Sequence, residues 1–320
     1  MKLTGRNIAV TGGAGFIGSH LVERIIQESP RNMVVIDNLF LGREENLEQA
    51  KEQFPTLRFY KVDASDYDTM KDILKNENVE VVYNLAVIPL PASLEKPRWT
   101  IDVNIAITNI FCELLREGFY QTLIHFSSSE AYGTAQYVPM DEKHPINPET
   151  PYAASKVAGD YIALSYRNTF GIDAVIVRPF NNYGPRQNKG AYAGIIPIVV
   201  QKAANGESVI IYGDGEQTRD FIFVKDTVNA AVKIYENPAT RGKIINIASG
   251  HETSINQLVR KILYLMGSNV KIIYDLPRLG DVRRHCGDIS LVKNLIGFEP
   301  SIIDDDHLRE TINWYIKRIK

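Results

Sequence analysis

The sequence has little cysteine, and it has neither a long apolar run nor a large excess of charge of one sign. Only Cys112 and Cys286 occur among 320 residues, which excludes a disulfide framework and a cysteine-rich zinc site. Scarce cysteine is typical of a reducing compartment, so we expect a cytoplasmic protein. No run of about 18 apolar residues occurs, and the first ten residues lack the apolar core of a signal peptide, so we expect no membrane partner.

Charge is nearly balanced, with 36 Lys and Arg against 38 Asp and Glu. The formal net charge of −2 gives no overall field that would attract nucleic acid, and we expect no nucleic-acid partner. Hydrophobic residues make up 44% of the chain, which is ordinary for a globular protein and argues against extended disorder. An anionic ligand would therefore have to be held by local positive groups. No cysteine spacing suggests a metal, and we expect none.

In the first half of the chain, short apolar runs alternate with segments of helical periodicity. Such alternation predicts an α/β fold with a parallel sheet that is covered by helices on both faces. The strand-like runs are residues 7–11, 33–36, 57–62, 81–85, 122–126 and 174–177, and the helical patterns are residues 18–28, 67–76, 100–117 and 152–169.

The pattern changes in the second half of the chain. Glycine and proline become frequent between residues 178 and 197, which is typical of loops. A strand-like run occurs at residues 209–212, and helical patterns occur at residues 196–205, 254–266, 290–295 and 305–318.

Two later strand-like runs bear on the domain organisation. They cover residues 221–224 and 244–247, and we expect both to rejoin the main sheet. No low-complexity linker separates the two halves. We therefore predict that residues 1–180, to which 221–250 return, form one domain, and that residues 181–320 form a smaller C-terminal domain interleaved with it.

A glycine-rich segment, VTGGAGFIGSH, follows the first strand and opens a helix. Gly12 would allow a tight turn, Gly15 would let the backbone approach a pyrophosphate at the helix N-terminus, and Gly18 would let helix and strand pack closely. Asp37 ends the second strand 19 residues after Gly18, where an acid accepts hydrogen bonds from ribose hydroxyls and repels a 2′-phosphate. This arrangement predicts NAD in preference to NADP. The alternative is a glycine-rich turn without a ligand.

Polar side chains also follow two other strands. Asp63 occurs in KVDASD, and three serines occur in HFSSSEAYG. Open α/β sheets place their ligands at the carboxyl ends of strands. Asp63 would either bond the adenine edge of a nucleotide or cap the following helix. A serine hydroxyl would either share a substrate proton or end the strand by bonding local backbone.

Tyr152 and Lys156 occur as YAASK within a helical pattern. A spacing of four places both side chains on one helix face. An unperturbed tyrosine has a pKa of about 10, which is too high for a base near neutral pH. A nearby ammonium and a positively charged nicotinamide would lower the pKa of Tyr152, which would then take a proton from a substrate hydroxyl. The alternative is a solvated helix face on which the spacing occurs by chance.

Seven motifs in order make the chain resemble a known family. It is similar to the extended short-chain dehydrogenases, in particular to the nucleotide-sugar epimerase/dehydratase family. The resemblance implies a Rossmann-type doubly wound NAD domain, a smaller domain for the nucleotide-diphosphate sugar, and NAD that stays bound and is reduced and reoxidised in each turnover. The motifs are TGGAGFIG, Asp37, SSSEAYG, PYAASK, RPFNNYGPRQ, GDGEQTRDFIFVKD and GDVRRH.

The resemblance also implies roles for single residues. Tyr152 matches the base, Lys156 its partner that holds the nicotinamide ribose, and Ser128 the hydroxyl that assists the tyrosine. The family usually has HLAA where this chain has NLAV, which is a mild departure at the strand end that lines the dinucleotide. The expected cofactor-binding residues are Gly12, Gly15, Phe16, Ile17, Gly18, Asp37, Asn38, Asp63, Ala64, Leu85, Ala86, Asn104, Tyr152, Lys156 and Pro179.

For the substrate, the resemblance points to the second half of the chain. Arg219 and Arg283 match arginines that grip the diphosphate, for which the forked guanidinium is suited because it bonds two phosphate oxygens at once. Taken in isolation, both could be surface arginines on loops. The expected substrate-binding residues are Ser129, Asn181, Arg186, Ile196, Pro197, Tyr212, Arg219 and Arg283.

The family shares oxidation of the sugar at C4, and the later steps differ between its members. Epimerases return hydride to the other face, 4,6-dehydratases lose water from C5 and C6, and decarboxylases lose a C6 carboxylate. Glu130 would take the C5 proton, so we expect a 4,6-dehydratase first, although some dehydratases have an aspartate where Ser129 stands. A 4-epimerase, a decarboxylase and an acid that only orders its loop stay open. A non-enzymatic NAD-binding scaffold should have lost Tyr152 or Lys156, and this chain has both.

Two apolar helical patterns bear on assembly. Residues 101–115 are apolar on more than one helix face, and residues 152–166 are similar. The family pairs these helices with their copies, so we expect a homodimer. The alternative is that one chain buries both faces by itself.

Overall fold

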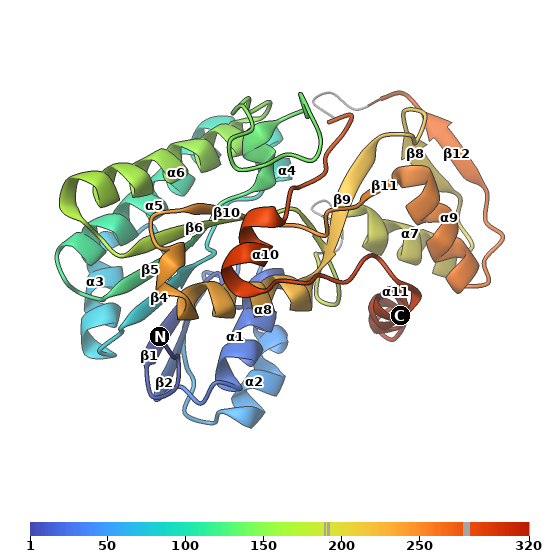
Figure 1. The fold of residues 1–320 in the computed structure, drawn as a ribbon. Helices are drawn as coiled ribbons and strands as arrows, with labels where there is room; N and C mark the ends of the chain where they lie inside the picture. Colours follow the sequence, from blue (N-terminus) through green and yellow to red (C-terminus); the bar gives the residue numbers. More distant parts are fainter. Residues whose placement is uncertain (189, 191–192, 278–281, 320) are drawn as a thin grey trace.

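Seven parallel strands form the central sheet of the larger of two lobes (Figure 1). The computed structural model describes residues 1–188, 190, 193–277 and 282–319. The predicted α/β fold with a parallel sheet is confirmed, and the strand order β3–β2–β1–β4–β5–β6–β10 is that of a doubly wound Rossmann-type sheet. The strands are β1 (Asn7–Thr11), β2 (Asn32–Ile36), β3 (Arg58–Tyr60), β4 (Val81–Asn84), β5 (Thr122–Phe126), β6 (Ala174–Pro179) and β10 (Ile244–Ile247).

Helices cover both faces of this sheet, and each face has its own apolar core, which is why the inner strands are continuous apolar runs (Figure 1). One layer contains α1 (Phe16–Ile26), α2 (Glu48–Gln53), α8 (Val224–Glu236) and α10 (Ser290–Ile296). The other contains α3 (Tyr67–Asn76), α5 (Pro97–Arg116) and α6 (Pro151–Phe170), with α4 (Leu90–Glu95) against α5 and α6.

The turn between β1 and α1 depends on two glycines. Gly12 has a φ of +64°, and a Cβ there would lie 2.9 Å from the carbonyl carbon of Leu85. A Cβ on Gly18 would lie 2.1 Å from the Gly12 carbonyl oxygen. Larger residues would therefore push α1 away from the ends of β1 and β4. These are the strands between which the order of the sheet reverses, and open α/β sheets bind ligands at that point.

The smaller lobe has a core of its own, which lies between short strands and three helices. One sheet consists of β7 (Asn181–Tyr183), β9 (Thr218–Phe223) and β11 (Glu252–Ser254), and β8 (Val209–Tyr212) pairs with β12 (Ile272–Asp275). The helices are α7 (Ile195–Ala204), α9 (Ile255–Leu265) and α11 (Asp305–Ile316).

Two features of the second half differ from the sequence-based expectation. Residues 221–224 do not rejoin the main sheet, because β9 pairs with β7 on one side and with β11 on the other. The chain returns to the larger lobe only after β9, through α8 and β10. Part of the expected loop region forms β7, a strand of three residues that is too short to show an alternating pattern.

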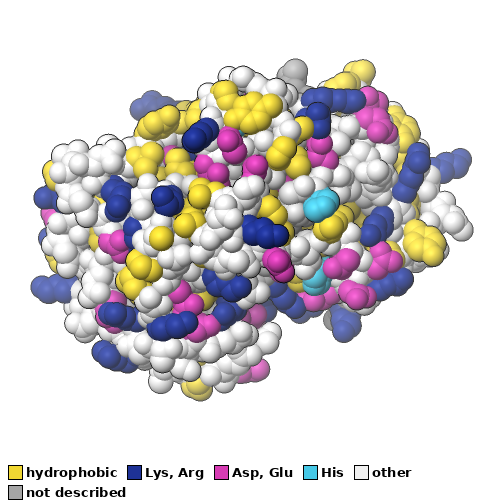
Figure 2. Space-filling model, viewed as in Figure 1, with side chains coloured by type: hydrophobic (Ala, Val, Ile, Leu, Met, Phe, Trp, Pro, Cys, Tyr) yellow, Lys and Arg dark blue, Asp and Glu magenta, His cyan; other side chains and the backbone are white. Residues whose placement is uncertain are grey.

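The surface charge and the apolar character of the helices can be compared with the composition. On the face drawn in Figure 2, Lys and Arg side chains are interspersed with Asp and Glu. Within the described ranges, no helix has both the length and the apolar character needed to cross a membrane.

Candidate active site

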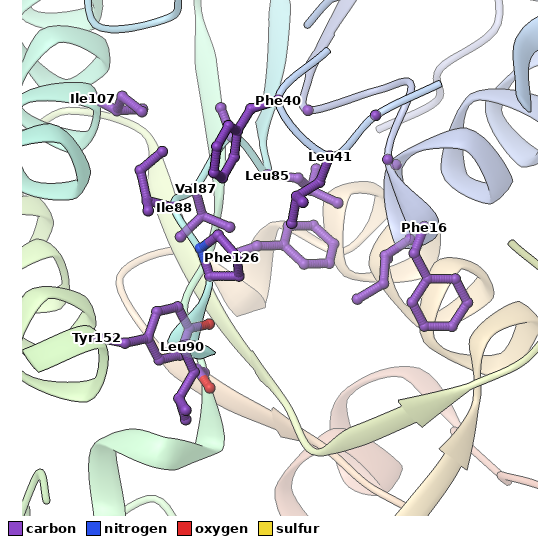
Figure 3. Close-up of a pocket in the computed structure, with 18 of the residues that line it drawn as sticks. Phe16, Phe40, Leu41, Leu85, Val87, Ile88, Leu90, Ile107, Phe126 and Tyr152 are labelled. Atoms are coloured by element: carbon purple, nitrogen blue, oxygen red, sulfur yellow. The ribbon is translucent and has the colours of Figure 1, made fainter. Parts of the chain in front are cut away.

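A cavity of about 440 Å³ opens at the carboxyl ends of the central strands. Its walls come from the turns that follow β1, β2, β3, β4, β5 and β6, and from α6. Figure 3 shows Phe16 at the start of α1 and Tyr152 on α6 at opposite sides of the cavity, with Leu85, Val87 and Phe126 between them. The pocket therefore spans the distance from the glycine turn to the YAASK helix.

The glycine end of the pocket has the features of a phosphate site. Gly12, Gly15 and Gly18 line it together with Phe16 and Ile17, as the sequence predicted. Gly15 is the N-cap of α1, so the first N–H groups of that helix face the cavity end where a pyrophosphate would lie. The close backbone packing at Gly12 leaves room for a dinucleotide that side chains would otherwise fill.

Asp37 lies in the pocket wall and also holds the glycine turn. Its carboxylate accepts hydrogen bonds from the N–H groups of Ala14 at 3.0 Å and Leu39 at 2.8 Å. Burial raises the pKa of this carboxyl, and the backbone donors oppose the rise. A carboxylate offers about four lone-pair sites, so Asp37 retains capacity for ribose hydroxyls.

Asp63 and Asn38 lie side by side in the same wall, next to Ala64. The Asn38 amide donates to Asp63 at 3.1 Å. Asp63 does not cap the following helix, because Asp66 is the N-cap of α3 and accepts from the Thr69 N–H. Asp63 instead accepts from the N–H and hydroxyl of Ser65 at 2.8 and 2.7 Å, and its contact with a nucleotide stays a prediction.

The strand end at Leu85 and Ala86 lines the cavity, whereas Asn104 lies behind it. The N–H groups of Leu85 and Ala86 both donate to the Thr11 hydroxyl, each at 3.1 Å. The buried Asn104 amide bonds the N–H of Ile88 at 2.7 Å and the carbonyl of Ile88 at 3.1 Å. Asn104 therefore supports the segment that follows β4 and is not itself part of the pocket lining.

Tyr152 and Lys156 line the pocket from α6, at the end opposite the glycine turn. The Lys156 ammonium is buried and donates to the Phe126 carbonyl at 2.5 Å. Burial lowers its pKa to about 8, while the Asp160 carboxylate opposes the shift. Pro179, at the end of β6, closes the same side of the pocket.

The pKa of Tyr152 is shifted in the direction opposite to the expected one. Burial raises it to about 12, and the carboxylates of Glu130 and Asp160 add to the rise, while a hydrogen bond from the Ser128 hydroxyl lowers it. The groups of the chain do not by themselves make this tyrosine a base at neutral pH. The positive charge of an oxidised nicotinamide is the remaining influence that would favour the phenolate.

Ser128, Ser129 and Glu130 follow β5 and line the pocket beside Tyr152. The Ser128 hydroxyl caps a short 3₁₀ turn, Ser129–Tyr132, by accepting from the Glu130 N–H at 3.2 Å. The same hydroxyl bonds the Tyr152 phenol. The local backbone bond is therefore present, and the hydroxyl also lies at Tyr152, while its share in a substrate proton stays a prediction.

The predicted substrate residues of the second half are spread more widely. Asn181 lines the pocket, whereas the other six lie outside its described lining. Arg186 pairs with Glu23 of α1 at 2.5 Å, and Arg219 donates to the Val282 carbonyl at 2.5 Å. Arg283 is largely exposed and pairs with Asp214 at 2.7 Å. Ile196 and Pro197 are buried in α7, and Tyr212 ends β8.

Several residues at the site were not among the predicted site residues, although Gln187 and His285 stand at the ends of the motifs RPFNNYGPRQ and GDVRRH. The segment 87–91 and the pair Phe40 and Leu41 form an apolar wall of the pocket. Gln187 extends the wall toward the smaller lobe, and the buried His285 contacts both Asn181 and Ser129. Apolar side chains in a turn give no local signal of a ligand. In the described part of the chain, no group of three or more His, Cys, Asp or Glu side chains could hold a metal ion.

The comparison with known families agrees with the motifs and the fold. The model of the NAD dependent epimerase/dehydratase family matches residues 8–248, which is most of the chain. The chain belongs to this family. The resemblance inferred from the sequence is thus confirmed, and NAD is the cofactor of the family.

Named relatives match nearly the full length of the chain. A UDP-glucose 4-epimerase of Mycolicibacterium smegmatis is 35% identical over 308 residues, which is 96% of this chain and 97% of the relative. The structure of a Thermotoga maritima UDP-glucose 4-epimerase with UDP-glucose has a TM-score of 0.92 at 31% identity and covers 98% of this chain and 100% of that one. A dTDP-glucose 4,6-dehydratase from Streptomyces venezuelae, solved with NAD, has a TM-score of 0.90 at 27% identity, with 97% of each chain covered.

The protein should release NAD and not NADP when it is denatured, because Asp37 opposes a 2′-phosphate. Asp37→Asn removes the charge and keeps one of the two oxygens, which accept separately from Ala14 and Leu39. We expect the preference for NAD over NADP to fall by about tenfold or more, since like charges brought together cost several kcal/mol. Chromatography of the released nucleotide and titration of the stripped protein measure both quantities. Recovery of mainly NADP from the unaltered protein would contradict the assignment.

Replacement of Tyr152 by Phe removes the proton acceptor with little change in volume. We expect turnover of a nucleotide sugar to fall by about 10²–10⁴-fold, with NAD content and fold retained. Tyr120→Phe is the matched control, because it removes another buried hydroxyl, one that bonds the Phe111 carbonyl far from the pocket. The control should lose about 1 kcal/mol of stability and keep its turnover. Near-normal turnover of folded Tyr152→Phe would refute the role of Tyr152.

Proposed function

We propose that this chain is an NAD-dependent nucleotide-sugar 4-epimerase. The observation that carries the proposal is the convergence of Ser128, Tyr152 and Lys156 on one end of the pocket, beside a single carboxylate, Glu130, among the residues described at that end. These groups suffice for redox chemistry at one sugar carbon. They do not include a second acid for the removal of water.

Each group has a task in this reaction. NAD held by the glycine turn and Asp37 would supply reversible hydride transfer at the sugar C4, with the hydride returned to the opposite face of the ring. The Tyr152 phenolate would take the proton of the C4 hydroxyl and give it back after the ketosugar has turned. The Ser128 hydroxyl donates to the tyrosine oxygen and stabilises its anionic form. The Lys156 ammonium would hold the nicotinamide ribose.

The substrate class is inferred from the pocket and from the relatives. A nucleotide-diphosphate hexose would extend from the catalytic end past Asn181 toward the smaller lobe, where Arg219 and Arg283 lie on neighbouring segments. Similar proteins are named for UDP-glucose, so a UDP-hexose is the first substrate to test.

Dehydration, which the sequence favoured, becomes the second candidate. Glu130 supports it, because its side chain lines the pocket close enough to Tyr152 to raise the pKa of the phenol. Loss of water also needs a proton for the departing C6 hydroxyl. Where some dehydratases have an aspartate for that task, this chain has Ser129, which is 3% exposed. A relative named as a UDP-glucose 4-epimerase is 35% identical to this chain, and relatives named as dTDP-glucose 4,6-dehydratases are 30% identical.

The two reactions differ at the C5–H bond, so the test is turnover in D2O followed by NMR. A 4-epimerase never breaks that bond, and we expect a product with the inverted C4 configuration and no carbon-bound deuterium. Glu130→Gln should therefore stay active. The matched control is Glu142→Gln, because Glu142 accepts from the Asn246 N–H outside the pocket and an amide can do the same.

Other outcomes identify the other reactions. Deuterium at C5 with loss of 18 mass units, together with an inactive Glu130→Gln, would contradict epimerisation and identify a dehydratase. Solvent deuterium with loss of 44 mass units from a uronic acid substrate would identify a decarboxylase.

We also propose a homodimer formed through α4 and α6. Most of the apolar positions of α5 that suggested a dimer in the sequence are buried within one chain, among them Ile107, Phe111 and Leu114. Leu94 on α4 and Tyr161 on α6 remain 62% and 59% exposed on neighbouring helices.

Light scattering at micromolar concentration should give the mass of a dimer, and Tyr161→Glu should give a monomer. Tyr264→Glu, at an 80% exposed position of α9, should leave the dimer intact. A monomeric unaltered protein would contradict the proposal.

A further inference from the structure

His285 lies where three segments of the chain meet, and the proposed reaction assigns it no task. Its imidazole is 1% exposed and packs on the Phe180 ring, with the ring centroids 4.9 Å apart. Its Nδ1 lies 3.5 Å from the Asn181 amide nitrogen, and its Nε2 lies 3.3 Å from the Ser129 carbonyl oxygen. One side chain therefore joins a predicted substrate contact to the turn that carries Ser128 and Glu130.

These two contacts determine the protonation state of the ring. A carbonyl oxygen only accepts, so Nε2 must carry the hydrogen that is donated to Ser129. Nδ1 is then bare and accepts from the Asn181 amide, which is the pattern of a neutral imidazole. Burial lowers the pKa of His285 to about 4, and the positive charge of Arg219 acts in the same direction, so the neutral form persists at physiological pH.

The segment that carries His285 is fixed to the smaller lobe. The Val282 carbonyl accepts from Arg219 at 2.5 Å, and the Arg283 carbonyl accepts from the Thr218 N–H at 3.0 Å. The Gly287 N–H donates to the buried Asp220 at 3.1 Å. A ligand that moves Arg283 or Arg219 therefore acts directly on the backbone next to His285.

The other end of the contact is the 3₁₀ turn beside the catalytic tyrosine. Ser129 stands between Ser128 and Glu130, and its carbonyl belongs to the same short turn. A shift of that carbonyl would move both neighbouring side chains relative to Tyr152. Both His285 contacts are at the long end of the hydrogen-bond range, so they have room to shorten when a ligand draws the lobes together.

We propose that His285 is a positioning residue that couples occupation of the diphosphate site to the placement of Ser128 and Glu130. Binding of the diphosphate by Arg283, Arg219 and Asn181 would press His285 against the Ser129 carbonyl. The turn would then hold Ser128 at the tyrosine oxygen. The inference rests on the proposed nucleotide-sugar chemistry but not on whether that chemistry is epimerisation or dehydration.

Two isosteric variants separate the two contacts. His285→Gln retains a donor near the Nε2 position, and so keeps the bond to Ser129. His285→Asn retains a polar atom near the Nδ1 position, and so keeps only the bond to Asn181. His285→Phe removes both but preserves the ring on Phe180. The control is His307→Phe, because the His307 ring also stacks on a phenylalanine, Phe223, with ring centroids 4.0 Å apart, and His307 is not among the residues that line the pocket.

The first measurement is hydrogen exchange of the amides of residues 128–133 with and without saturating UDP. In the unaltered protein, UDP should slow exchange of the turn. The protection should persist in His285→Gln and in the control, and it should be lost in His285→Asn and His285→Phe. Protection that survives in His285→Asn would overturn the inference.

The second measurement is kcat and KM, with the appearance of reduced nicotinamide near 340 nm as a readout of C4 oxidation. We expect kcat to fall about tenfold to hundredfold in His285→Asn and His285→Phe, because small misplacements of catalytic groups have effects of that size. KM should change little, and His285→Gln should recover most of the rate. The control should stay within about twofold of the unaltered protein.

The outcomes distinguish this inference from the proposed function. An equal loss of kcat in His285→Gln and His285→Asn would show that His285 acts only through packing. That result would overturn the inference and leave the proposed function unaffected. If His285→Phe does not fold, the comparison of His285→Gln with His285→Asn still shows whether His285 acts through its bond to Ser129. If none of UDP, dTDP, GDP and CDP binds the unaltered protein, the proposed function fails and the inference fails with it.

Discussion

A buried ion pair between Asp160 of α6 and Arg178 of β6 fixes the helix on which the chemistry depends. One Asp160 oxygen accepts two hydrogen bonds from the Arg178 guanidinium, at 2.7 and 3.0 Å, and both side chains are buried. Loss of either partner would leave an uncompensated buried charge, which typically costs about 3–5 kcal/mol. Tyr152 and Lys156 lie two turns and one turn before Asp160 on the same helix. The pair therefore determines where both project at the ends of β5 and β6.

The pocket lies between this fixed helix and a smaller lobe held by a second buried carboxylate. Asp220 of β9 accepts from the N–H groups of Ser249, Gly250 and Gly287, so two separated segments are joined to β9 by one side chain. The larger lobe thus supplies the dinucleotide turn and the redox groups, while the smaller lobe supplies the arginines. His285 lies on the boundary between them, which is why it can connect binding with chemistry.

The features that the sequence predicts well are local. The glycine turn, Asp37 and the YAASK helix each rest on a few adjacent residues whose geometry the motif itself requires, and all line the pocket. The features that it predicts poorly depend on tertiary context. Residues 221–224 look like any strand, and only pairing with β7 and β11 puts them in the smaller sheet. The raised pKa of Tyr152 results from burial that no spacing reveals, and His285 becomes notable only when Asn181 and Ser129 are brought to it.

The central claim is that hydride leaves and returns to the same sugar carbon. A nucleotide hexose with deuterium at C4 tests it most directly, because the label reports the path of the hydride itself. We predict a product with the inverted C4 configuration that keeps its deuterium at C4, since the label passes to the bound nicotinamide and back. Deuterium found at C6 of a dehydrated product, or an inverted product that has lost its C4 label to solvent, would contradict the claim.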